Sequence, residues 1–406
     1  MTASTDLQEC SGGVTAPQGF LADGLYCGIR KAKKDLALVA SKSPASAAAV
    51  FTKNKTQAAP ILVDRFQLQR SSVCSAIVVN SGNANACTGE RGLDDAWSMV
   101  RTAAHALGLP EEQVWVASTG VIGQYLPMEK IEPGIRQLSV QLSKRGGHRA
   151  AEAIMTTDTF PKQYAVQLRL GSSQVTIGGM AKGSGMIAPN MATMLAFVTT
   201  DAAVPAPVLQ QALRRANELS FNRITVDGDM STNDMVLVLA NGEAGNKPVA
   251  VGSPAYADFS SALEHVLVTL AKMIARDGEG ATKLIEVSVE GAATEEEAVQ
   301  AARAVANSNL VKTAIHGADA NWGRIMAAFG SSGIEFTPER VEIAFNDLPV
   351  LQQNFVIVMN EEQAAEVLNQ DTIVVHVNLN QGAATARFWT CDLTKQYVHI
   401  NASYRS

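Results

Sequence analysis

Residues 178–201 read GGMAKGSGMIAPNMATMLAFVTTD, and this stretch decides how the fold is interpreted. Glycines at 178, 179, 183 and 185 allow positive φ angles and close approach of backbone groups. Pro189 restricts Ala188 to extended geometry. An apolar, strand-like run, MLAFVTT, begins directly after Thr193. A glycine-rich loop that leads straight into a buried strand is well suited to hold Thr193 in a fixed position.

The loop does not match two common catalytic motifs. A phosphate-binding P-loop requires GxxxxGK[ST], whereas Lys182 precedes the second glycine here. A GxSxG nucleophile elbow would need glycine at position 182. By its local spacing alone, the stretch is more typical of a glycine-rich turn without chemistry.

Helices and strands are predicted on both sides of this loop without a regular alternation. Apolar periodicity indicates helices over 93–107, 208–219, 263–276, 295–306 and 361–368. Strand patterns are AIVVN (76–80), VWVAS (114–118), the hairpin YAVQLRL–GSS–QVTIGGMA (164–181), MVLVLAN (235–241), LIEVSVEG (284–291), VEIAF (341–345), NFVIVM (354–359) and TIVVHVNL (372–379). The pattern predicts an α+β fold in which helices cover stacked sheets, not a doubly wound parallel sheet.

A domain boundary is predicted near residue 282, at the end of ARDGEGATK (275–283), because a fresh set of strands follows it. Residues 1–282 would then form a layered α/β domain that contains the glycine-rich loop. Residues 283–406 would form a smaller C-terminal α+β domain.

The composition favours a soluble protein that handles small molecules. The 406 residues are 47% hydrophobic and 18% charged, and the formal net charge is −6. Basic and acidic residues are interspersed, so we expect no nucleic-acid partner. We also expect no membrane span and no secretory signal, hence a cytoplasmic location. The five cysteines form no CxxC pair, which favours free thiols in a reducing compartment.

Two further polar clusters are weaker signals. HGAD (316–319) offers only two metal ligands, so no metal is expected. VDGDMSTND (226–234) contains Asp227, Asp229 and Asp234 but lacks the spacing of an EF-hand. We interpret it as a loop near the active site. The spacing of the six histidines identifies no Ser/His/Asp-like arrangement.

KGSGMIAPNMATM (182–194) resembles the cleavage-site signature of the ornithine acetyltransferase (glutamate N-acetyltransferase) family of arginine biosynthesis. Seven other segments match family blocks in the same order along nearly the whole chain: VNSGNANACTG (79–89), ASTGVIG (117–123), MTTDTFPK (155–162), FNRITVDGDMSTND (221–234), ARDGEGATK (275–283), GADANWGRI (317–325) and INASYRS (400–406).

The resemblance implies a layered αββα domain of the self-cleaving, N-terminal-nucleophile type. It implies cleavage between Ala192 and Thr193, which would give an α chain, 1–192, and a β chain, 193–406. Thr193 would then be the nucleophile, and its new α-amino group, with an ordinary pKa of about 7.7–8.0, would be the base.

The resemblance also implies a set of site residues. The Thr119 hydroxyl and the Gly120 N–H would form the oxyanion hole, and substrates would bind Thr157, Lys182, Thr193, Glu279, Asn401 and Ser406. Other functions stay open: Thr119-Gly120 could be a strand-ending turn, Lys182 could assist only self-cleavage, and Glu279 could cap a loop. At Ser406 we would expect threonine, although the hydroxyl is retained.

The implied reaction moves an acetyl group from N-acetylornithine to glutamate by ping-pong chemistry through acetyl-Thr193, without a cofactor and in an α2β2 assembly. Whether acetyl-CoA is also a donor stays open. Two alternatives remain. One is a self-cleaving amidase or aminopeptidase of the same architecture, a group that uses serine at the new N-terminus. The other is a non-catalytic binding module.

Overall fold

The computed structural model describes residues 7–188 and 194–403, which form two compact units. The first unit comprises residues 7–183, 194–222 and 230–271. The second comprises residues 184–188, 223–229 and 272–403. The predicted division at residue 282 remains a prediction.

The first unit is built on a nine-stranded sheet with the order β1-β6-β7-β8-β9-β3-β4-β5, in which β2 also pairs with β3. Its strands are β1 (Gln8–Glu9), β2 (Phe20–Leu25), β3 (Leu36–Phe51), β4 (Val73–Asn83), β5 (Val114–Val121), β6 (Lys162–Leu170), β7 (Ser173–Lys182), β8 (Leu195–Thr200) and β9 (Met235–Ala240). Its helices are α1 (Ala59–Arg70), α2 (Gly89–Leu107), α3 (Met128–Gln141), α4 (Gly147–Ala153), α5 (Ala206–Glu218) and α6 (Pro254–Arg276), whose residues from Lys272 onward belong to the second unit.

The long strand β3 divides this sheet into two halves. Residues 36–40 of β3 pair with β4, and residues 46–51 pair with β9, with a register irregularity between Ala40 and Ala45. Apolar side chains of the two halves, such as Ile77 of β4 and Leu237 of β9, share one core cluster. The sheet therefore folds over itself through β3.

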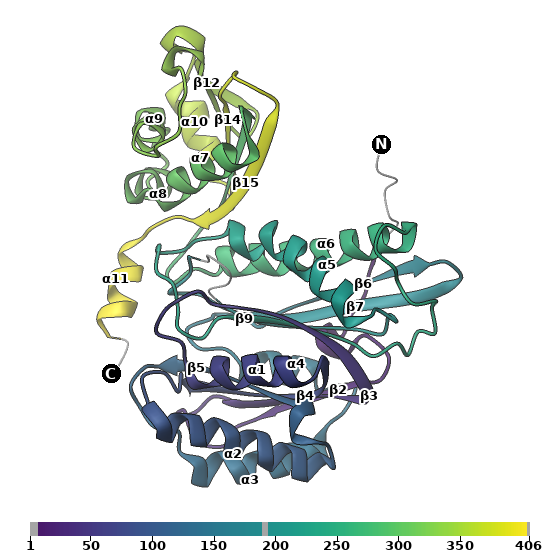
Figure 1. The fold of residues 1–406 in the computed structure, drawn as a ribbon. Coiled ribbons are helices and arrows are strands. Elements are labelled where there is room, and N and C mark those ends of the chain that lie inside the picture. The colour runs from purple at the N-terminus through teal and green to yellow at the C-terminus, as the bar shows by residue number, and fades with distance from the viewer. Residues whose placement is uncertain (1–6, 189–193, 404–406) are drawn as a thin grey trace. The chain divides into compact units, whose positions relative to one another are not determined.

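Helices cover the two outer faces of this folded sheet (Figure 1). Helices α2 and α3 pack their apolar residues on the half that contains β4 and β5. On the other half, the Gln210 side chain of α5 bonds both backbone groups of Ala49, and Leu270 of α6 lies against Gly179 of β7. The predicted layered α+β fold is confirmed, with the layers in the order α, β, β, α.

The second unit contains a six-stranded sheet with the order β13-β12-β11-β14-β10-β15. Its strands are β10 (Leu284–Ala292), β11 (Glu342–Phe345), β12 (Leu348–Gln352), β13 (Val356–Ile357), β14 (Thr372–Asn378) and β15 (Ala384–Cys391). Its helices are α7 (Glu295–Asn307), α8 (Asn309–His316), α9 (Trp322–Gly330), α10 (Glu361–Leu368) and α11 (Lys395–Ala402). One core cluster joins the sheet to helices α7 to α10, so this unit is a smaller α+β layer structure.

Most predicted elements form, but NFVIVM (354–359) is shorter than predicted. Its apolar residues suggested a full strand, whereas only Val356–Ile357 pair as β13. Asn354 and Phe355 have positive φ angles, 56° and 59°, which interrupt the extended geometry.

Candidate active site

The segment predicted to form an oxyanion hole lies at the end of β5. Thr119 is buried, and the parallel ladder with β4 places Gly120 beside Gly82. Gly120 has φ 137°, and an added Cβ would lie 2.2 Å from the Gly82 carbonyl carbon. Only glycine fits this approach, so Gly120 itself specifies the backbone geometry at the end of β5.

Two buried asparagines hold this end of β5 in place. The Asn80 side chain accepts a hydrogen bond from the Ser118 hydroxyl (2.6 Å) and donates to the Asn83 carbonyl (2.9 Å). The Asn233 amide donates to the carbonyls of Ala84 (2.6 Å) and Ser118 (2.8 Å). Asn233 thus ties the residue before Thr119 to the chain that enters β9.

Lys182, at the end of β7, belongs to a buried charged cluster. Asp158 accepts from the ammonium group of Lys162 (2.7 Å) and from the Gly183 N–H (2.7 Å). Burial opposes ionisation of Asp158, but the charges of Lys162 and Lys182 and these hydrogen bonds outweigh it. They hold the pKa of this carboxyl well below its ordinary value, so Asp158 is a carboxylate.

The same cluster reaches the start of β8, the strand that follows the predicted cleavage site. The ladders place Leu195 of β8 between Lys182 of β7 and Met235 of β9, and the Met235 N–H donates to the Met194 carbonyl (3.0 Å). Asp234 precedes Met235 and is buried. Burial raises the pKa of the Asp234 carboxyl well above its ordinary value, against bonds from Ser231 and the charge of Lys182.

Thr157 lies half-buried next to Asp158 in the same unit. Thr119, Gly120, Thr157 and Lys182 therefore all lie in the first unit, where the charge of Lys182 acts on both Asp158 and Asp234. Ala192, Thr193 and Ser406 lie outside the described residues.

Glu279 and Asn401, both predicted to bind substrate, are in contact within the second unit. The Asn401 amide donates to the Glu279 carboxylate (2.7 Å), which is largely buried. Gly185 lies against this carboxylate, and an added Cβ would be 2.4 Å from its carbon. The Glu279 N–H also donates to the Ser184 carbonyl (2.9 Å). This bond joins Ser184 to residues 277–283, which follow helix α6 and are called the Glu279 loop below.

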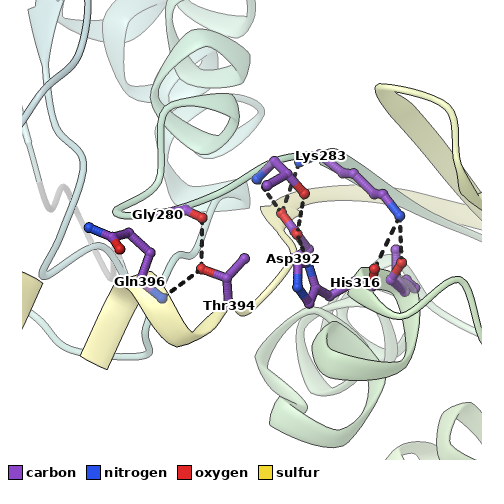
Figure 2. A network of polar contacts seen from close by, with 8 residues as sticks. Gly280, Lys283, His316, Asp392, Thr394 and Gln396 are labelled. Carbon is purple, nitrogen blue, oxygen red and sulfur yellow. Dashed lines mark hydrogen bonds and ion pairs between the residues drawn. The ribbon is translucent and has the colours of Figure 1, made fainter. Parts of the chain in front are cut away.

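A network centred on Asp392 anchors this loop (Figure 2). The Asp392 carboxylate accepts from the backbone N–H groups of Thr282 (2.7 Å) and Lys283 (2.8 Å), and its Oδ2 lies 2.8 Å from His316 Nδ1. Burial opposes ionisation of Asp392, but these bonds lower the pKa of its carboxyl. The Asp392 carboxylate is therefore a fixed anion that holds the Glu279 loop.

The start of α11 is attached to the same loop. The Thr394 hydroxyl donates to the Gly280 carbonyl (2.8 Å) and accepts from the Gln396 N–H (3.1 Å), which caps the helix (Figure 2). The Glu279 loop and the helix that carries Asn401 are therefore held by one set of polar contacts.

Sequence reasoning did not identify Asn80, Asn233, Asp158 or Asp392 as supports of the site. The first three lie inside the quoted family blocks, so the blocks were the available signal. Asp392 lies outside them, and its hydrogen-bond partners His316 and Thr282 are 76 and 110 residues away in the sequence.

The described part of the chain contains neither a metal-ligand cluster nor a membrane-spanning helix. Its His, Cys, Asp and Glu side chains form no group of three that could hold a metal ion. Among the helices of residues 7–188 and 194–403, none has the length and apolar character needed to cross a membrane.

Comparison with known proteins identifies the family. The model of the ArgJ family matches residues 21–406. The chain belongs to the ArgJ family. The arginine biosynthesis bifunctional protein ArgJ of Symbiobacterium thermophilum is 56% identical over 403 residues, which cover 98% of this chain and 100% of the relative. The protein of the same name from Oceanobacillus iheyensis is 51% identical over 407 residues, covering 99% and 100%.

Solved structures of two family members also match. The arginine biosynthesis bifunctional protein argJ of Bacillus halodurans is 45% identical, with a TM-score of 0.45, and the match covers 47% of this chain and 100% of that chain. The ornithine acetyltransferase of Mycobacterium tuberculosis, solved with ornithine, is 41% identical, with a TM-score of 0.43, and the match covers 46% and 100%.

Proposed function

We propose that this protein is an acetyltransferase of arginine biosynthesis that moves the acetyl group of N-acetylornithine to glutamate. Membership of the ArgJ family supports this activity, since its relatives are named as arginine biosynthesis proteins and a solved member is an ornithine acetyltransferase. The observation that carries the proposal is the geometry at the end of β5, where the oxyanion hole is predicted: Gly120, at φ 137°, follows Thr119, and the nearby Ser118 carbonyl accepts from the Asn233 amide.

The first step is self-cleavage before Thr193. The Thr193 hydroxyl attacks the Ala192 carbonyl, the peptide becomes an ester as the nitrogen leaves and takes up a proton, and water hydrolyses that ester. The products are a carboxylate at Ala192 and an α-amino group at Thr193. With an ordinary pKa of about 7.7–8.0, part of this amine is neutral near pH 7.5 and can accept the hydroxyl proton.

The second step is acetyl transfer. The Thr193 oxygen attacks the acetyl carbonyl of N-acetylornithine, and the Thr119 hydroxyl and the Gly120 N–H stabilise the oxyanion, which is worth about 3–4 kcal/mol per donor in related chemistry. Ornithine leaves with the proton, and glutamate then takes the acetyl group from the Thr193 ester.

Substrate recognition follows from charge. Lys182 pairs with the α-carboxylate that both substrates carry, and the nearby Asp158 carboxylate keeps the surroundings favourable to a cation. Glu279, oriented by Asn401, binds the ornithine side-chain ammonium. Thr157 and Ser406 complete the binding set.

The name "bifunctional" of the curated relatives supports a second activity, in which acetyl-CoA acetylates glutamate directly. Acetyl-CoA would be a co-substrate, and the reaction would need no bound cofactor or metal. We further propose that two α and two β chains assemble as α2β2 in the cytoplasm.

Denaturing gel electrophoresis tests the cleavage. Wild-type protein should give two bands near half-size, whereas Thr193→Ala should remain full-length and inactive. Thr193→Ser keeps the hydroxyl and serves as the control that should still be cut. A full-length wild-type band, or cleavage of Thr193→Ala, would refute the assigned bond.

A transfer assay separates the acetyltransferase from a self-cleaving amidase. Mature protein is incubated with N-acetylornithine with and without glutamate. Acetylglutamate should form much faster than free acetate, and the reverse result would favour the amidase. Adding acetyl-CoA with glutamate in a second assay tests the second activity.

A further inference from the structure

Asp227 receives four hydrogen bonds within the second unit. Its Oδ1 accepts from the N–H groups of Ile187 (2.8 Å) and Asp229 (3.3 Å). Its Oδ2 accepts from the Met186 N–H (2.6 Å) and the Tyr397 hydroxyl (3.2 Å). One carboxylate therefore joins three separate parts of the chain.

The first of these parts, residues 184–188, immediately precedes the segment that contains the proposed cleavage site. Two successive N–H groups of it, those of Met186 and Ile187, point at the Asp227 carboxylate, and Met186 takes a left-handed φ of 55°. The Ile187 carbonyl also accepts from the Val226 N–H (2.7 Å) and the Thr225 hydroxyl (3.1 Å). Residues 184–188 are thus held in one conformation by residues 225–227.

The second part is helix α11. Tyr397 lies one turn before Asn401, and the Asn401 amide donates both to the Tyr397 carbonyl (3.1 Å) and to Glu279 (2.7 Å). Burial, together with the Asp227 carboxylate, raises the pKa of the Tyr397 phenol, which keeps it a hydrogen donor. Because α11 has no buried side chain, such polar contacts determine its position.

We propose that Asp227 is a positioning residue that serves two steps: it fixes residues 184–188 for self-cleavage, and it orients α11 so that Asn401 holds Glu279. The inference rests on the proposed function and adds to it a residue that touches no reacting atom.

The chemistry at position 227 requires a carboxylate. Each of its two oxygens accepts from two donors, so the residue must offer acceptors at both positions. Asparagine in either orientation would turn its NH₂ group toward two of those donors. Asp227→Asn is therefore a change of one atom that disrupts two of the four bonds.

Cell-free translation of the full chain measures the first role. Precursor made in a short pulse is followed on a denaturing gel, and Asp227→Asn should lengthen the half-time of cleavage by about tenfold or more, as expected when bonds to a charged acceptor are lost. Asp229→Asn is the matched control: it removes an exposed carboxylate two residues away and should change the half-time by less than about twofold.

Mature Tyr397→Phe measures the second role. It should raise KM for N-acetylornithine by about three- to tenfold while kcat stays within about twofold, because the change weakens the hold on α11 and leaves the nucleophile untouched. A purely structural role would instead lower the amount of active enzyme, and so kcat, at constant KM.

Wild-type cleavage speed of Asp227→Asn, or an unchanged KM of Tyr397→Phe, overturns the proposal. If circular dichroism shows that Asp227→Asn does not fold, the KM of Tyr397→Phe decides alone. A wild-type chain that is never cut would instead refute the proposed function, so the two failures are distinguishable.

Discussion

Replacing Asp158 by asparagine should destabilise the first unit strongly. Asp158 is 3% exposed, Lys162 is fully buried, and their charged groups are 2.7 Å apart. The substitution removes the carboxylate but leaves the Lys162 ammonium in the interior. Breaking a buried pair in this way costs about 3–5 kcal/mol, which corresponds to a fall in melting temperature of about 6–20 °C for a domain of this size.

Two control variants make the test specific. Glu152→Gln breaks the ion pair with Lys34, which has the same 2.7 Å distance but side chains that are 35% and 36% exposed, and should cost less than about 1 kcal/mol. The double variant Asp158→Asn/Lys162→Met removes both charges and should recover most of the lost stability.

The pH dependence gives a second check on the same residue. Because the folded-state pKa of Asp158 is lowered, its stabilisation is complete above the unfolded pKa of about 3.9 and is lost as pH falls below it. The stability difference between wild type and Asp158→Asn should be constant from pH 5 to 7 and should shrink in acid. A thermal shift under about 2 °C at neutral pH, or a double variant as unstable as the single one, would refute the reasoning.

Three further variants test the end of β5 and the surroundings of Glu279 by steady-state transfer kinetics. Gly120→Ala forces a Cβ to within 2.2 Å of the β4 backbone and should lower kcat by about 10²–10³-fold. An unaltered kcat would contradict the role proposed for Gly120. Asn233→Asp replaces two donated hydrogen bonds by contacts between oxygens and should lower kcat at least about tenfold with little change in KM. Gly185→Ala places a Cβ 2.4 Å from the Glu279 carboxyl carbon and should raise KM for N-acetylornithine. Gly330→Ala is the control, because open space surrounds Gly330, and it should leave KM unchanged. Equal effects of the two variants on KM would rule out the assigned contact.

The sequence predicted those parts of the fold in which local pattern and tertiary environment agree. The hairpin of β6 and β7 follows from strand alternation around Gly171-Ser172-Ser173, and it forms as expected. Helix α3 shows the opposite case. Pro133 and Gly134 are typical of a break, yet the helix continues through both residues. Gly134 lies close against Leu36 of β3, and an added Cβ would be 2.7 Å from that side chain, a tertiary contact that has no local sequence signal.

The site was predicted less completely than the fold. Family blocks predicted Thr119, Gly120, Lys182, Glu279 and Asn401 as site residues. These roles stay predictions, and the structure shows only that Glu279 and Asn401 are hydrogen-bonded to each other. Asn233 could not have been assigned its partners from pattern, because it bonds carbonyls 149 and 115 residues away. Hydrogen bonds between distant loops leave no periodic signal in a single sequence.

The order of strands has a consequence for the two proposed chains. Strands β8 and β9 are inserted between β7 and β3, so a cut before Thr193 would place the two central strands of the sheet on one polypeptide and their outer neighbours on the other. The α and β chains would share one sheet, so their separation would break the ladders between β7 and β8 and between β9 and β3. The melting temperature of the cleaved protein should therefore rise with protein concentration, as it does for chains that have no stable folded form alone.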